Sequence, residues 1–136
     1  MTRFLPLLAL VFIALTGTAQ ARGSVPVVNY ENVQLASNSG KLVSADAAKQ
    51  AIRAAAASKS WTVALDGDAL IATLVVRNKH TVTVSIVLRG DKYSLLFKDA
   101  VNMNVMERDG QTLIHPFYNR WVQDLNEAIR IELLKI

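Results

Sequence analysis

The chain has 136 residues, a net charge of +4 at pH 7 and no cysteine. This length suits one domain with a hydrophobic core. The lack of cysteine excludes disulfides, thiol catalysis and Cys-ligated metal sites. The basic residues stand singly along the chain, whereas nucleic-acid binding needs a concentrated basic face, so we expect no nucleic-acid partner.

The first residues have the three parts of a cleavable secretory leader. Arg3 gives a positive start, Phe4 to Leu15 form an apolar run, and Ala19-Gln20-Ala21 fits the small-x-small cleavage pattern. A membrane-spanning helix needs roughly 20 apolar residues, so a retained anchor is the weaker interpretation. We therefore expect residues 1–21 to be a signal peptide and the mature protein to start at Arg22. The expected product is a secreted, soluble periplasmic protein rather than a membrane-anchored one.

Residues 22–43 are predicted to form an extended, partly docked N-terminal arm, because they combine Pro26, Gly40 and several polar residues with short apolar stretches. A helix is expected to follow, since Ser44 is a favourable N-cap and residues 47–59 are rich in helix formers. Its apolar stripe is small, which suits close packing. The stripe consists of Ala48, Ala51, Ile52 and Ala55.

From Trp61 the apolar period changes from helical spacing to two, which predicts four strands of an antiparallel meander over residues 61–66, 70–77, 81–89 and 93–98. Two-residue turns at Gly67-Asp68 and Gly90-Asp91 pair apolar residues with apolar residues, and glycine at the first turn position suits type II′. In the middle hairpin, the apolar faces of the two strands lie on the same side of the sheet only if the loop has an odd number of residues. We predict a three-residue loop, Asn78-Lys79-His80, with Arg77 paired to Thr81.

Residues 99–115 are predicted to be irregular, although Asp109-Gly110 could support a short hairpin. His115-Pro116 then opens a final helix, with Pro116 at its first position. Each large apolar side chain of this helix contributes roughly 1.5–3 kcal/mol when buried, so the helix is expected to be the main stabiliser of the core. Its stripe is formed by Tyr118, Trp121, Val122, Leu125, Ile129 and Leu133.

The predicted fold is a single α+β domain over residues 44–136, in the order α-β-β-β-β-α. The four-stranded antiparallel meander should carry both helices on its apolar face. The other face is rich in Thr, Ser and Val, so it can meet water or serve as a docking surface.

Few residue patterns in this sequence support catalysis. The two histidines lie in different loops, and no His-x-x-x-His, Gly-x-Ser-x-Gly, Ser-x-x-Lys or phosphate-cradling Gly-rich loop is present. Asp66 and Asp68 flank a turn, and Asp124 and Glu127 suit a solvated helix face. We therefore expect no catalytic residues, no metal and no cofactor.

The densest polar and aromatic cluster is His115, Pro116, Tyr118, Asn119 and Trp121. In a structural interpretation, His115 lies near the helix N-cap while Tyr118 and Trp121 pack on the sheet with their polar tips satisfied. In a functional interpretation, His115, Asn119 and free N–H groups of the helix N-terminus hold an anionic group.

The segment Ile114-His115-Pro116-Phe117-Tyr118-Asn119-Arg120-Trp121-Val122 carries a family resemblance. Together with the Ala-rich run before Trp61, it resembles the C-terminal Ile-His-x-x-Tyr-Asn-x-Trp-Val motif of small uncharacterised Gram-negative periplasmic and lipoprotein-like proteins. The resemblance covers most of residues 44–134. It implies this element order and a cell-envelope location, and it supplies no catalytic residues. Many such relatives have a Cys at the signal junction, where this chain has Ala21-Arg22.

Three functions remain open on the sequence. The first is a non-enzymatic module that binds an envelope protein or a small ligand, through the polar sheet face or through loops containing His80, Asn102, Asn104 and His115. The second is a carrier of a small apolar or lipid-like ligand between helices and sheet. The third is a hydrolase or transferase using His115 with Tyr118 or Asn119. A pocket beside His115 would favour carriage or chemistry, and a filled core would favour protein interaction.

Overall fold

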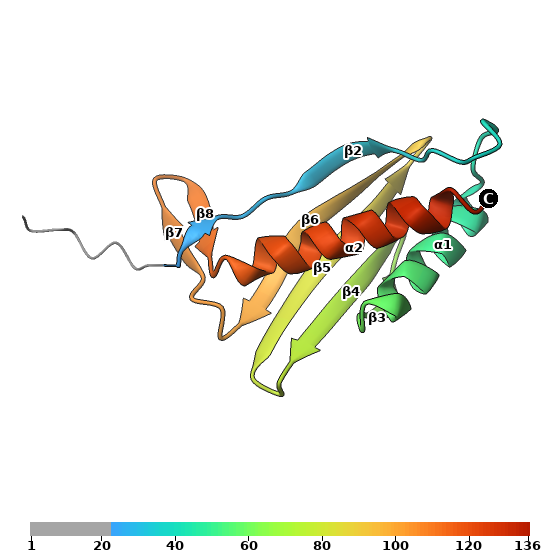
Figure 1. Cartoon of the computed structure of the whole chain (residues 1–136). Helices are drawn as coiled ribbons and strands as arrows, with labels where there is room; N and C mark the ends of the chain where they lie inside the picture. The colour runs from blue at the N-terminus through green and yellow to red at the C-terminus, as the bar shows by residue number, and fades with distance from the viewer. Residues whose placement is uncertain (1–22) are drawn as a thin grey trace, which may run out of the picture.

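The computed structural model describes residues 23–136, so the predicted signal peptide lies outside the described residues. These residues form an α+β domain (Figure 1). The elements are β1 (Val25–Pro26), β2 (Tyr30–Gln34), α1 (Ala45–Ser58), β3 (Thr62–Asp66), β4 (Ala69–Val76), β5 (His80–Arg89), β6 (Lys92–Val101), β7 (Met106–Arg108), β8 (Gln111–Ile114) and α2 (Phe117–Leu133).

The strands form two antiparallel sheets rather than one. The larger has five strands in the order β2-β6-β5-β4-β3, and the smaller has three in the order β1-β8-β7. The predicted meander is present as β3 to β6, but the prediction of a single four-stranded sheet is wrong. The N-terminal arm supplies the fifth strand because Tyr30 and Val33 pair with Leu95 and Tyr93, which places apolar side chains of β2 over the core.

The hairpin turns largely follow the predicted register. Leu65 pairs with Leu70 and Leu88 with Tyr93, as expected from the two Gly-Asp turns. The β7–β8 hairpin turns at Asp109-Gly110.

The middle loop has the predicted odd length but begins one residue earlier than expected. It consists of Arg77, Asn78 and Lys79, and His80 opens β5 opposite Val76 instead of lying in the loop. The reason is local, because Arg77 and Asn78 adopt left-handed φ angles of 56° and 52°. This conformation lets the Lys79 N–H donate to the Val76 carbonyl at 3.1 Å, which closes the turn early.

Both helices lie on the same side of the five-stranded sheet (Figure 1). The predicted cap of α1 is confirmed, because Ser44 Oγ accepts a hydrogen bond from Ala47 N at 3.1 Å. The predicted α1 stripe is buried, and its alanines let the helix pack closely beside α2. Within residues 23–136, no helix is both long and apolar enough to cross a bilayer.

Two tyrosines are buried in the core, and only one of their hydroxyls makes a hydrogen bond. Tyr93 Oη donates to Asn126 Oδ1 at 2.6 Å, so both polar groups are satisfied. Tyr118 packs edge-on against Phe97, with ring centroids 5.3 Å apart, and its hydroxyl has no hydrogen-bond partner. The prediction that the polar tip of Tyr118 would be satisfied is therefore wrong.

Burial makes the stability of this core sensitive to alkaline pH. Desolvation raises the pKa of Tyr93 to about 12, from 10.0 for an exposed tyrosine. Between these two values the unfolded chain loses the phenolic proton while the folded chain keeps it, so the free energy of unfolding should fall as pH rises through this range. Urea unfolding across the same range is expected to show this loss, with a shallower slope in Tyr93→Phe. Equal slopes in both proteins would contradict it.

Candidate functional site

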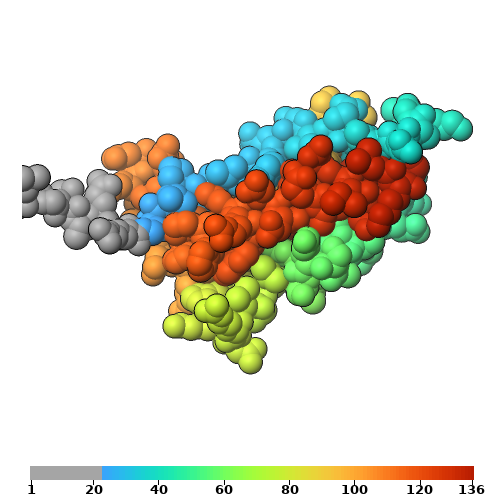
Figure 2. All heavy atoms as spheres, in the orientation of Figure 1, coloured from blue at the N-terminus to red at the C-terminus, as the bar shows by residue number. Residues whose placement is uncertain are grey.

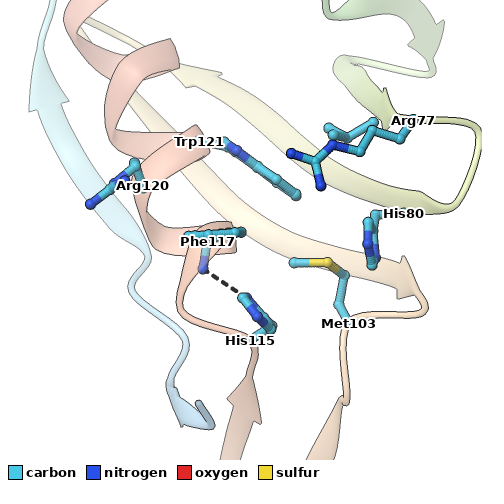
Figure 3. Close-up of a pocket in the computed structure, with 8 residues that line it drawn as sticks. Arg77, His80, Met103, His115, Phe117, Arg120 and Trp121 are labelled. Atoms are coloured by element: carbon cyan, nitrogen blue, oxygen red, sulfur yellow. Dashed lines mark hydrogen bonds between the residues drawn. The ribbon is translucent and has the colours of Figure 1, made fainter. Parts of the chain in front are cut away.

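A pocket of about 230 Å³ opens beside the start of α2 (Figure 3). It lies between that helix, the β4–β5 turn and the β6–β7 connection. In Figure 2 the turn, in yellow-green, projects from the body of the molecule below the first turns of α2. The residues that line the pocket are Val76, Arg77, His80, Met103, His115, Phe117, Arg120 and Trp121.

The connection after β6 brings the two histidines to one place. The Asn102 carbonyl accepts a hydrogen bond from His80 Nδ1 at 2.7 Å, and the next carbonyl, that of Met103, accepts one from His115 N at 2.8 Å. Asn102 also donates from Nδ2 to the Lys79 carbonyl at 2.7 Å, which fastens the β4–β5 turn. Asn102 and Asn104 both have left-handed φ angles, which asparagine tolerates better than most residues.

The hydrogen bonds determine which ring nitrogen of each neutral imidazole carries the proton. A carbonyl oxygen can only accept, so His80 carries a proton on Nδ1 and, when neutral, leaves Nε2 as an acceptor. His115 is the opposite case, because Phe117 N donates to its Nδ1 at 3.1 Å. Neutral His115 therefore carries its proton on Nε2 and offers a donor. When neutral, the two imidazoles therefore differ at Nε2, which is an acceptor in His80 and a donor in His115.

His115 also acts as the N-cap of α2. Its Nδ1 accepts from Phe117 N and its carbonyl accepts from Tyr118 N at 3.0 Å. Pro116 already has helical dihedral angles, with φ −56°, so it occupies the first helical position as predicted. The N–H groups of Phe117 and Tyr118 are consequently occupied, so these two donors of the helix N-terminus are not free to hold an anion.

Capping by His115 can be separated from its contribution to the pocket. Replacing His115 by alanine removes the acceptor for Phe117 N and is expected to lower the free energy of unfolding by about 1 kcal/mol. His115→Asn keeps a favourable capping side chain and should recover most of that loss while still removing the imidazole. Urea unfolding of both variants tests this, and equal destabilisation by alanine and asparagine would rule out the capping role.

Aromatic side chains form one wall of the pocket. The Phe117 ring lies between His115 and Trp121, with centroid distances of 4.7 Å and 6.0 Å. Arg120 sits over Phe117 with its Cζ 5.9 Å from the ring centroid, and in Figure 3 its side chain points away from the cavity. Arg77 points into the cavity from the opposite side, toward Trp121 and Met103 (Figure 3).

The donor set of the pocket suits an anion better than a metal cation. Two of the eight lining residues are arginines and none is an aspartate or glutamate. To ligate a metal through Nε2, His115 would have to move its proton to Nδ1 and lose the bond from Phe117 N. Among residues 23–136 no group of three or more His, Asp or Glu side chains is placed to hold a metal ion.

The other residues singled out in the sequence lie outside the pocket. Tyr118 is fully buried in the core. Asn119 points to the N-terminal arm, where its Oδ1 accepts from Val28 N and its Nδ2 donates to the Pro26 carbonyl, both at 3.0 Å. The Asn102 carbonyl accepts the hydrogen bond from His80, although Asn102 does not itself line the pocket, and Asn104 is exposed. Tyr118 and Asn119 were considered as partners of a catalytic His115. Neither of them lines the pocket that His115 lines.

The two hydrogen bonds of Asn119 are expected to hold the arm in place. Replacing Asn119 by alanine should lower the free energy of unfolding by about 1–2 kcal/mol, since two backbone groups lose their partner. Amide hydrogen exchange should accelerate at Val28. Gln123→Ala, at an exposed position of the same helix, should change neither quantity. Unchanged exchange at Val28 in the Asn119 variant would contradict the role.

Sequence reasoning missed Arg77, Met103 and Phe117 as members of the site. Arg77 was expected to be a strand residue, whereas the early turn places it beside the cavity. The available signal was a basic residue at the end of the predicted strand, directly before the predicted loop that contains His80. No sequence pattern pointed to Met103, because its place depends on the hydrogen bond that its carbonyl accepts from His115 N.

Two segments distant in the chain, residues 76–80 and 115–121, thus build one pocket through the connection at residues 102–104. The pocket combines positive charge, two imidazoles with defined hydrogen bonds and an aromatic wall. Comparison with protein-family models, with curated proteins and with solved structures found no match for this chain.

Proposed function

We propose that this chain is an exported, non-enzymatic binding module whose ligand occupies the pocket at His80 and His115. The single observation that carries the proposal is the convergence of both histidines, Arg77 and Trp121 on one cavity. Ligand pockets are typically apolar hollows with a few oriented polar groups, and this cavity has that composition. A small-ligand role is favoured over a purely protein-binding one, because the pocket lies beside His115.

The export part of the proposal rests on residues 1–21 and on the family resemblance of residues 114–122. Expression of the whole chain in a Gram-negative host should yield a periplasmic protein whose N-terminal sequencing starts at Arg22. Recovery of the uncleaved chain from the cytoplasm or from the membrane would contradict this part and leave the pocket proposal standing.

A compound screen with two matched variants tests the binding site. Val76 lines the pocket, whereas Val75 lies on the opposite face of β4 and is 53% exposed. Compounds that raise the melting temperature of the wild-type domain should lose that effect in Val76→Phe, which fills the cavity, and keep it in Val75→Phe. The proposal fails if no compound stabilises the wild type, or if Val75→Phe abolishes binding and Val76→Phe does not.

A further inference from the structure

We infer that the pocket takes a small molecule in which one oxyanion, a carboxylate or a phosphate, is joined to a ring or a short apolar chain. This inference deepens the proposed function and rests on it. It assigns the recognition of the oxyanion to Arg77 and that of the apolar part to Trp121, Phe117 and Met103.

The charge of Arg77 has no partner in the described part of the chain. Four salt bridges are present among residues 23–136, and none involves Arg77. In Figure 3 its guanidinium points into the cavity, whereas Arg120 is placed behind the Phe117 ring. A planar guanidinium can donate two parallel, charge-assisted hydrogen bonds to a carboxylate or phosphate, which makes arginine well suited to bind either group.

The backbone of Arg77 supports a role beyond the turn. Its φ of 56° is left-handed, a conformation that is sterically unfavourable for an L-residue with a long side chain. Asparagine or glycine is favoured at this position of a tight hairpin turn. A turn built only for stability would therefore be served better by another residue, which fits a role for the Arg77 side chain in the pocket that it lines.

The rest of the pocket fits the remaining part of such a ligand. His115 offers an Nε2 proton as a second donor. The aromatic wall and the buried Met103, 2% exposed, provide an apolar surface. A volume of about 230 Å³ lies below the range usual for drug-sized ligands, so it suits a single ring or a short chain.

Calorimetric titration of the mature chain with matched probes tests the inference. Phenylacetate, hexanoate and phenyl phosphate carry the oxyanion, while phenylacetamide is neutral and phenethylamine is cationic. The anionic probes are expected to bind about tenfold or more tightly than the neutral and cationic ones, which corresponds to about 1.4 kcal/mol. Their affinity should fall with added salt. Comparison of phenylacetate with phenyl phosphate identifies which oxyanion the site prefers.

Two variants of the same turn separate Arg77 from general electrostatic attraction. Arg77→Asn relieves the strained backbone, so it should fold with equal or greater stability while losing about tenfold or more in affinity for phenylacetate. Lys79→Asn removes an equal charge from an exposed residue outside the pocket, so it should change affinity less than about twofold. If the first variant keeps at least the stability of the wild type in thermal unfolding, weaker binding cannot be attributed to unfolding.

The outcomes distinguish this inference from the proposed function. Equal binding of phenylacetamide and phenylacetate, or equal effects of the Arg77 and Lys79 variants, would overturn the oxyanion assignment and leave the pocket as a binding site. Failure of every anionic probe to bind would also overturn the assignment. In that case the screen with the Val75 and Val76 variants still decides whether the pocket binds a ligand of another class.

Discussion

Replacing Ile129 by alanine is expected to lower the free energy of unfolding by about 2–5 kcal/mol, because the side chain is fully buried in the α2 stripe. The cost has two parts: the lost burial of the apolar group and the cavity left in the core. Chemical denaturation monitored by circular dichroism measures it, with an unchanged dependence on denaturant if the two-state transition is kept.

Ile131 provides the matched control for this prediction. It lies two residues further along α2 and is 56% exposed, so alanine there removes the same atoms from the opposite side of the helix. The expected change is within about 0.5 kcal/mol. Similar losses at both positions would contradict the assignment of α2 as the helix that closes the core.

Removing the hydroxyl from the two buried tyrosines is expected to change stability in opposite directions. Tyr93→Phe leaves Asn126 Oδ1 buried without its donor and should cost about 1–3 kcal/mol. Tyr118→Phe keeps the ring contact with Phe97 and removes a buried hydroxyl that has no partner, so it should stabilise the domain by about 1 kcal/mol.

Both variants remove one tyrosine hydroxyl from the same core, so each variant is a control for the other. Thermal and urea unfolding both report the difference. A loss of stability in Tyr118→Phe similar to that in Tyr93→Phe would show that the Tyr118 hydroxyl makes a favourable polar contact in solution.

Local patterns in the sequence were sufficient to predict the elements whose stabilising contacts are near in the chain. The period of two and the Gly-Asp turns gave β3 to β6 and two of their hairpin registers. The Ser44 cap and the apolar stripes gave both helices.

The N-terminal arm was harder to predict because its strands are short and depend on distant partners. β2 carries a register shift between Tyr30 and Val33, where Asn32 has a left-handed φ of 54°, so its apolar residues do not alternate regularly. β1 has two residues and is held by pairing with β8 and by Asn119. Such contacts span most of the chain and leave no local pattern.

The candidate pocket depends on distant contacts in the same way. His80 and His115 were singled out in the sequence as candidate binding residues, and both line the pocket, although His80 opens β5 instead of lying in a loop. Their convergence depends on the carbonyl oxygens of Asn102 and Met103, which no side-chain pattern reveals. Asn119, which seemed equally suited to a ligand, proved to bind the backbone of the arm.

An amide chemical-shift map of the ¹⁵N-labelled mature domain during titration with phenylacetate tests the binding pocket most directly. The predicted result is that concentration-dependent shifts are confined to residues 76–81, Met103 and residues 115–121, which surround the cavity. Shifts centred instead on the uncovered sheet face, at Thr73 and Ser85, or no shifts in any region, would contradict binding of this ligand class in the pocket.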